Sequence, residues 1–134
     1  MSSIFTKIVN GEIPCHKIYE TDNVLAFLDI NPVNPGHTLV IPKEEIDDLF
    51  DLKPEVYAEL MEVVRKVAKA VQKAKNPLRV GLMVLGFDVA HAHVHVLPLQ
   101  QSGDLMTRRM VNPDLPERGQ SELGTDAEEI VAEL

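Results

Sequence analysis

The stretch His91-Ala92-His93-Val94-His95-Val96-Leu97 decides how this chain is interpreted. Three histidines occupy every second position, and apolar residues fill the positions between them. Because successive side chains of a β-strand point to opposite faces, the alternation predicts a strand with three imidazoles on one face and an apolar surface on the other. Near neutral pH an imidazole can act as a nucleophile, an acid, a base or a metal ligand. The stretch therefore indicates a functional site carried by a sheet.

Two blander interpretations of the three histidines stay open at this point. Histidine is intermediate in burial, so the residues could serve packing and hydrogen bonding only. Histidine pairs on strands also bind metals, although such sites usually add a glutamate and a further histidine at distinct spacing. The chain shows no such constellation, and we expect no metal and no cofactor.

Short elements separated by turn signals surround the histidine stretch. The long helix is the best defined, because Pro54 suits its first turn, apolar residues recur at helical spacing and Asn76-Pro77 ends it. The pattern also predicts a helix over 4–9, a hairpin of strands over 16–20 and 24–28, and strands over 38–41, 79–85 and 89–97, with Pro42 and Pro98 as stops. This mixture predicts an α+β fold.

Composition limits the class of protein. With 134 residues, 45% of them hydrophobic and 25% charged, the chain is typical of a soluble globular protein with one core. It has no apolar run near the roughly 20 residues of a membrane span. A single cysteine, Cys15, allows no internal disulfide, so we expect a cytoplasmic protein. The net charge of −8 argues against binding to nucleic acid or acidic membranes.

The last quarter of the chain differs from the rest. We expect a main domain over residues 1–100 and an acidic arm over 101–134, rich in Gly, Pro, Asp and Glu. A capping box from Thr125 to Glu128 predicts a short terminal helix beginning at Thr125, with Ile130, Val131 and Leu134 docking on the domain. A disordered acidic tail is the alternative.

Together with the histidine stretch, three further blocks resemble the histidine triad (HIT) family, in its Hint-like branch of nucleotide hydrolases and transferases. The family signature is three histidines alternating with apolar residues, which residues 91–97 meet at every position. The other matching blocks are Ile4-Phe5-Thr6-Lys7-Ile8-Val9-Asn10-Gly11-Glu12-Ile13-Pro14, Phe27-Leu28-Asp29-Ile30-Asn31-Pro32 and Pro35-Gly36-His37-Thr38-Leu39-Val40-Ile41-Pro42-Lys43. The resemblance covers about residues 3 to 98.

The resemblance implies both a fold and an activity. The fold is a mainly antiparallel sheet of about five strands with one long helix and a short N-terminal helix, in a homodimer whose two sheets join. The activity is displacement at the α-phosphate of purine nucleotide conjugates, such as phosphoramidates or dinucleoside polyphosphates. A histidine attacks phosphorus, and water then releases a nucleoside monophosphate from the nucleotidyl-histidine intermediate.

The resemblance also assigns roles to residues. His93 is the nucleophile, with its other nitrogen held by a carbonyl, and His95 contacts the phosphate or the leaving group. His91 orients the site and is linked to His37. Asp29 binds the ribose hydroxyls, although an aspartate before Asn31-Pro32 could also be a turn residue. The base is held by four apolar residues, Phe5, Ile8, Phe27 and Ile30.

The sequence departs from the family at two places. The segment 82–90 lacks the Gln and Ser that hold phosphate in many members, so backbone amides near Gly86 and Val89, or Arg108 and Arg109, would have to replace them. This loss supports an alternative function, a non-catalytic nucleotide-binding regulatory homodimer. Some relatives also bind a structural zinc at positions that match Ser3, Thr6 and Glu45; none of these is a good zinc ligand in that arrangement, and we expect no structural zinc.

Overall fold

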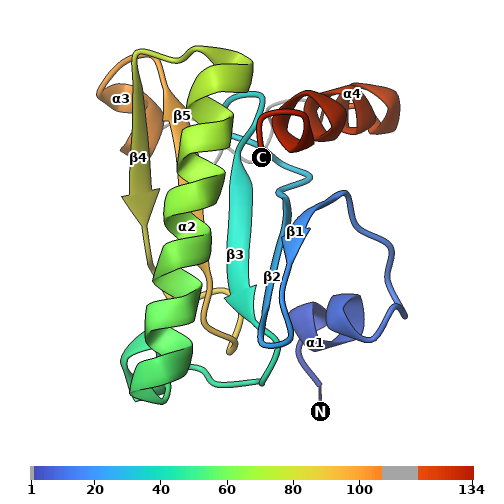
Figure 1. Cartoon of the computed structure of the whole chain (residues 1–134), viewed down its shortest axis with the longest axis vertical. Coiled ribbons are helices and arrows are strands. Elements are labelled where there is room, and N and C mark those ends of the chain that lie inside the picture. The colour runs from blue at the N-terminus through green and yellow to red at the C-terminus, as the bar shows by residue number, and fades with distance from the viewer. Residues whose placement is uncertain (1, 107–117) are drawn as a thin grey trace.

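A five-stranded sheet with helices on both faces forms the centre of the molecule (Figure 1). The computed structural model describes residues 2–106 and 118–134. All neighbouring strands are antiparallel, in the order β1-β2-β3-β5-β4, which confirms the predicted α+β fold. In chain order the elements are α1 (Ile4–Val9), β1 (Lys17–Glu20), β2 (Val24–Leu28), β3 (Thr38–Pro42), the 3-10 turn η1 (Leu49–Asp51), α2 (Pro54–Lys75), β4 (Arg79–Met83), β5 (Val94–Leu99), α3 (Gly103–Met106) and α4 (Gln120–Val131).

Several strand ends differ from the sequence expectation. β3 includes Pro42, and β5 continues through Pro98 to Leu99, because a proline near a strand end loses only one ladder hydrogen bond. The histidine strand begins at Val94 and not at residue 89, and β4 ends at Met83. Before Val94 the backbone makes a different contact, because the N–H of Ala92 donates to the carbonyl of Ile46 at 2.7 Å.

The two faces of the sheet pack against different helices. Alternation along β2 sends Val24, Ala26 and Leu28 toward α2, where they join the larger apolar core. The intervening Leu25 and Phe27 face the other way and pack with Phe5 of α1. This second, smaller cluster is completed by Leu39 and Ile41 of β3.

The terminal helix α4 packs on the sheet domain, against α2 and β1. It begins at Gln120 and not at Thr125, and the Glu122 carboxylate accepts from the N–H of Gly119 at its start. Ile130 is fully buried, as expected, but Val131 and Leu134 are about half exposed, so their predicted docking is wrong. The residues that dock beside Ile130 are Leu123 and Ala127.

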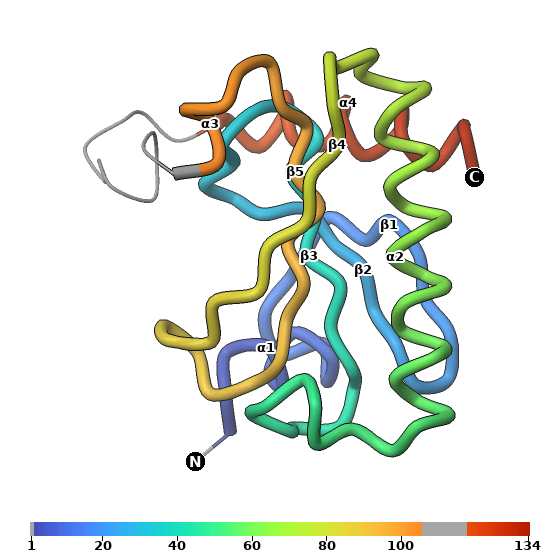
Figure 2. Tube along the Cα trace, turned by 90° about the vertical axis from the view of Figure 1, so that its left-hand side faces the viewer, coloured from blue at the N-terminus to red at the C-terminus, as the bar shows by residue number. Residues whose placement is uncertain are grey.

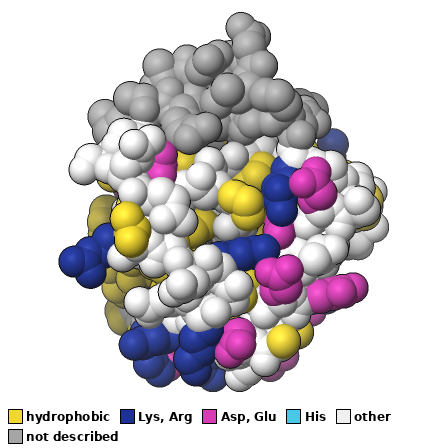
Figure 3. All heavy atoms as spheres, turned by 90° about the horizontal axis from the view of Figure 1, so that it is seen from above, with side chains coloured by type: hydrophobic (Ala, Val, Ile, Leu, Met, Phe, Trp, Pro, Cys, Tyr) yellow, Lys and Arg dark blue, Asp and Glu magenta, His cyan; other side chains and the backbone are white. Residues whose placement is uncertain are grey.

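A buried carboxylate anchors α4 to the end of the long helix. Asp126 is 1% exposed and forms ion pairs with Lys75 of α2, at 2.6 Å, and with Arg118. Two cationic partners offset the cost of removing this carboxylate from water. Figure 3 views this end of the molecule and shows acidic and basic side chains lying side by side on it. Within the described residues, no helix has the length and apolar composition needed to cross a membrane.

Candidate active site

The sheet face opposite α2 carries the functional side chains. Strand register pairs Leu39 with Phe27 on one side and with His95 on the other, so these three residues form a row across the sheet. His93 lies just before β5, with its ring centroid 5.1 Å from that of His95 and 5.0 Å from that of Phe5. Pairing of β3 with β5 therefore brings histidines and an apolar surface together.

A backbone carbonyl fixes the tautomer of His93. Its Nδ1 lies 2.8 Å from the carbonyl oxygen of His91, and a carbonyl only accepts, so Nδ1 carries the proton. The neutral ring therefore has its lone pair on Nε2. The side chain is 6% exposed and lines the pocket described below. The carbonyl expected from the sequence is present, and it belongs to the first histidine of the triad.

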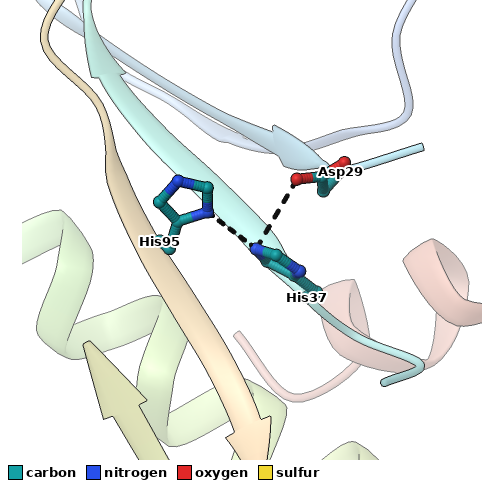
Figure 4. Close-up of side chains that lie close together, drawn as sticks. All are labelled: Asp29, His37 and His95. Carbon is teal, nitrogen blue, oxygen red and sulfur yellow. Dashed lines mark hydrogen bonds and ion pairs between the residues drawn. The ribbon is translucent and has the colours of Figure 1, made fainter. Parts of the chain in front are cut away.

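A second chain of hydrogen bonds fixes the opposite tautomer in His95. The N–H of Val33 donates to His37 Nδ1 at 3.0 Å, so the proton of neutral His37 is on Nε2. That proton is donated to His95 Nδ1 at 2.9 Å, which leaves the His95 proton on Nε2 (Figure 4). His93 and His95 therefore differ at Nε2, which has a lone pair in the first ring and a hydrogen in the second.

Burial keeps this pair of rings neutral. It lowers the pKa of His37, which is 2% exposed, against a weaker opposing effect of the Asp29 carboxylate. Burial is also the main cause that lowers the pKa of His95 to about 4, with repulsion from His37 and His93 adding to it. At neutral pH the His37–His95 hydrogen bond thus joins two uncharged imidazoles.

His91 is not linked to His37, and that expectation is wrong. The antiparallel pairing of β3 and β5 places His37 at the start of β3 and His91 near its end. His91 Nε2 lies 2.8 Å from the carbonyl of Pro42, and its Nδ1 lies 2.7 Å from Ser3 Oγ. The ring is fully buried, and burial lowers its pKa although the Pro42 carbonyl opposes this effect.

Asp29, His37 and His95 are close enough to hold a metal ion, but their hydrogen bonds favour another arrangement. Asp29 Oδ2 lies 3.6 Å from His37 Nε2, and Figure 4 shows both neighbours directed at His37. To bind an ion between Asp29 and His95, His37 would need a lone pair at Nε2, the atom that faces them. In His37 the lone pair is on Nδ1, where Val33 donates, so metal binding would require the proton to move and this hydrogen bond to break. The cluster is better described as a hydrogen-bonded relay.

A pocket of about 410 Å³ lies in front of these rings. Eight of the nine predicted site residues line it; His91 is the exception. The apolar part is formed by Phe5, Ile8, Phe27 and Ile30, and the polar part by Asp29, His37, His93 and His95. Asp29 accepts a hydrogen bond from the N–H of Asn31 at 2.8 Å, as expected if it is a turn residue. It also lines the pocket, as expected if it binds a ligand there.

The loop between β4 and β5, where the sequence suggested backbone amides as replacements for the missing Gln and Ser, forms part of the pocket wall. Figure 2 shows this loop at the same end of the sheet as α1. Its residues 85–89 line the pocket, and Phe87 is 88% exposed there. Among the described residues, no lysine or arginine lines the pocket. Arg108 and Arg109 lie outside the described residues. Cys15 also lines the pocket, and burial raises the pKa of its thiol.

Fold and site together define a histidine triad protein: the chain belongs to the HIT family, whose domain model matches residues 10–102. It is 44% identical over 99 residues to an adenosine 5′-monophosphoramidase of Schizosaccharomyces pombe, covering 73% of this chain and 74% of that one. The structure is similar to that of a Hit-like protein of Bartonella henselae involved in cell-cycle regulation, with a TM-score of 0.83, 33% identity and coverage of 99% and 97%. It is also similar to a zinc-bound histidine triad protein of Mycobacterium smegmatis, with a TM-score of 0.79, 31% identity and coverage of 99% and 93%.

The lowered pKa of His95 predicts how stability depends on pH. Its folded pKa is about 4, below the ordinary value of about 6.5, so between these values the unfolded chain binds more protons. The free energy of unfolding should therefore decrease as the pH falls from 6.5 to 4. In denaturant titrations, the free energy of unfolding of His95→Gln should decrease less steeply with falling pH than that of the wild type. The two slopes should differ by up to about 1.4 kcal/mol per pH unit. Equal slopes in the two proteins would contradict the assignment.

Proposed function

We propose that this chain hydrolyses purine nucleotide conjugates at the α-phosphate through a nucleotidyl-His93 intermediate and releases a nucleoside monophosphate. The observation that carries the proposal is the opposite state of the two Nε2 atoms, a lone pair on His93 and a proton on His95. Family membership and the name of the Schizosaccharomyces pombe relative support a nucleotide hydrolase in general.

In the first step the lone pair of His93 Nε2 forms a bond to phosphorus, and the bond from phosphorus to the leaving group breaks. The leaving nitrogen or oxygen departs with a proton taken from solvent, and His95 Nε2–H donates a hydrogen bond to it, because a neutral imidazole does not release its single N–H proton near neutral pH. The His93 ring becomes positively charged, and the carbonyl of His91, which accepts its Nδ1 proton, stabilises that charge.

In the second step water attacks phosphorus and the bond to His93 Nε2 breaks. One proton of the attacking water is released to solvent, His93 returns to its neutral state, and His95 keeps its Nε2 proton throughout. The same two rings thus serve both steps, His93 as nucleophile and then leaving group, and His95 as hydrogen-bond donor.

The remaining pocket residues suit a nucleoside. The apolar walls of Phe5, Ile8 and Phe27 can sandwich a base, and their lack of hydrogen bonding gives purine preference without strong discrimination between adenine and guanine. Asp29 retains acceptor capacity beyond its bond from Asn31, and two adjacent ribose hydroxyls suit its two oxygens.

The charge of the pocket favours phosphoramidates over dinucleoside polyphosphates. Among the described residues its lining carries two carboxylates, Asp29 and Asp88, and no cationic side chain. A phosphoramidate has little charge at the leaving group, whereas a polyphosphate chain would place several negative charges beside these acids.

The nucleophile is tested by AMP release from adenosine 5′-phosphoramidate, followed by chromatography. His93→Ala should lower kcat about 1,000-fold or more, because the group that forms the covalent bond is lost. The matched control is His16→Ala, a histidine outside the pocket that contacts Gln120, which should retain the wild-type rate. If wild type binds AMP in calorimetry but releases none from the conjugate, the non-catalytic binding protein is correct instead.

We also propose a homodimer joined through β4. This strand is at one edge of the sheet, and an antiparallel edge can pair with its own copy about a twofold axis. Exposed apolar side chains lie along it at Leu78, Leu82 and Val84, and a groove beside them is lined by Met61 and Ala68 of α2. Pairing two such edges would cover both the backbone groups and these side chains.

Sedimentation velocity tests the dimer with two variants of the same chemistry. Leu82→Glu places a charge at the proposed interface and should convert the dimer to a monomer. Leu134→Glu makes the same change at a leucine that is also 47% exposed but lies after α4, and it should remain dimeric. A wild-type chain that sediments as a monomer contradicts this part of the proposal.

A further inference from the structure

Three polar side chains, those of Ser3, Thr6 and Glu45, form a cluster with His91, and none of the four residues lines the pocket. Ser3 Oγ lies 2.7 Å from His91 Nδ1, and Ser3 N–H donates to Glu45 Oε1 at 2.6 Å. Thr6 Oγ1 donates to the same carboxylate oxygen at 2.7 Å. Ser3 is thus joined to Glu45, 42 positions later in the chain, and to His91, 88 positions later. We call this network the Ser3–Glu45 cluster (Ser3, Thr6, Glu45 and His91).

Each proton of this cluster can be assigned once, without conflict. His91 Nε2 donates to the Pro42 carbonyl, so its Nδ1 is an acceptor and receives the hydroxyl proton of Ser3. Ser3 Oγ in turn accepts from the N–H of Thr6 at 3.0 Å, as the N-cap of α1. The Glu45 carboxylate accepts from both remaining donors, and these hydrogen bonds lower its pKa.

The cluster does not fit the structural zinc that the family implies. The M. smegmatis protein is zinc-bound. The resemblance of the sequence to the family implies that in some relatives the ligands of a structural zinc fall at the positions of Ser3, Thr6 and Glu45. Serine and threonine hydroxyls are poor zinc ligands, since zinc sites use thiolate, imidazole and carboxylate groups. The lone pair of His91 Nδ1, which a zinc ion would need, already accepts the Ser3 proton.

We propose that the Ser3–Glu45 cluster holds the start of α1 against His91 without a metal, at the place where the resemblance puts a structural zinc in some relatives. Ser3, Thr6 and Glu45 are positioning residues in this account. They fix the His91 ring, and the backbone carbonyl of the same residue holds the Nδ1 proton of His93. The cluster therefore sets the geometry of the nucleophile from outside the pocket.

Phe5 extends the same connection into the pocket wall. It lies on α1 between Ser3 and Thr6 and makes edge contacts with the rings of His91, at 5.7 Å, and His93, at 5.0 Å. Loosening the start of α1 would thus disturb both the nucleophile and the surface that faces the base. Ser3 and Thr6 are three residues apart, so their hydroxyls lie on one side of α1, where one contacts His91 and the other Glu45.

Three substitutions at the start of the chain test the positioning role. Ser3→Ala removes the proton donated to His91 and should lower kcat for AMP release about tenfold. Ser3→Thr keeps the hydroxyl and should restore the rate, and Ser2→Ala, at the exposed neighbour, is the matched control with wild-type kcat. A wild-type rate in Ser3→Ala, or failure of Ser3→Thr to recover any activity, overturns the role.

The kinetic test rests on the proposed hydrolase function, so a second readout is independent of it. In proton NMR, the downfield ring N–H that His91 donates to Pro42 should broaden in Ser3→Ala and stay sharp in Ser3→Thr and Ser2→Ala. If no variant releases AMP but this signal behaves as described, the function fails and the cluster stands. A signal that is equally sharp in Ser3→Ala contradicts the cluster alone.

Equilibrium dialysis against zinc chloride tests the absence of metal. The wild-type chain should retain no zinc at stoichiometric level. The variant Ser3→Cys/Thr6→Cys/Glu45→His supplies zinc-binding groups at the same positions beside His91, and it should retain one zinc per chain and gain thermal stability from it. Stoichiometric zinc in the wild-type chain that is lost in Ser3→Ala would overturn the proposal.

Discussion

The hydrogen bond between His93 Nδ1 and the carbonyl of His91 is the constraint on which the site depends. Without an acceptor at Nδ1 the His93 proton could occupy either nitrogen, and half the rings or more would present a hydrogen where a lone pair is needed. A backbone carbonyl cannot change its role, so it selects one tautomer at every pH at which the ring is neutral. The fold holds that carbonyl by pairing the adjacent Ala92 N–H with Ile46.

His95 is held in the opposite tautomer, and the backbone group that determines it is an N–H donor instead of a carbonyl. Val33 presents an N–H to His37, and the direction of that one hydrogen bond passes through two imidazoles to His95. Burial lowers the pKa of both rings, so neither gains a second proton at neutral pH and the direction of the His37–His95 hydrogen bond is kept. One carbonyl and one amide, both ordinary parts of the main chain, thus make two identical side chains chemically different.

Periodicity and turn chemistry were sufficient to predict most of the fold. α1, β2 and α2 occupy the predicted residues, because each is an apolar stretch or stripe bounded by turn and stop signals. The start of β5 was not predictable in this way, since the alternation of His91, Ala92 and His93 continues that of the strand while the hydrogen bond of Ala92 goes elsewhere. The start of α4 was missed because Thr125, an apparent cap, bonds back to Ser121 inside the helix.

Sequence motifs predicted most of the residues that line the pocket, but not which of them contact one another. The alternating histidines, Asp29 and the apolar positions were found by motif, whereas the partner of His37 depends on which ends of β3 and β5 meet, a property of strand pairing. The exposed Phe87 had no periodic signal to mark it. The sequence marked Ser3, Thr6 and Glu45 only as unsuited to zinc. Their hydrogen bonds to one another and to His91 join residues far apart in the chain, so no local pattern predicts them.

NMR of the chain with ¹⁵N-labelled histidine measures directly which ring nitrogens carry protons. Two-bond correlations between ring carbon-bound protons and nitrogens distinguish the two neutral tautomers, and single histidine substitutions assign the signals. At neutral pH the account predicts Nδ1–H in His93 and Nε2–H in His37, His91 and His95. A His93 ring that is protonated at Nε2, or a His95 ring that is protonated at Nδ1, would contradict it.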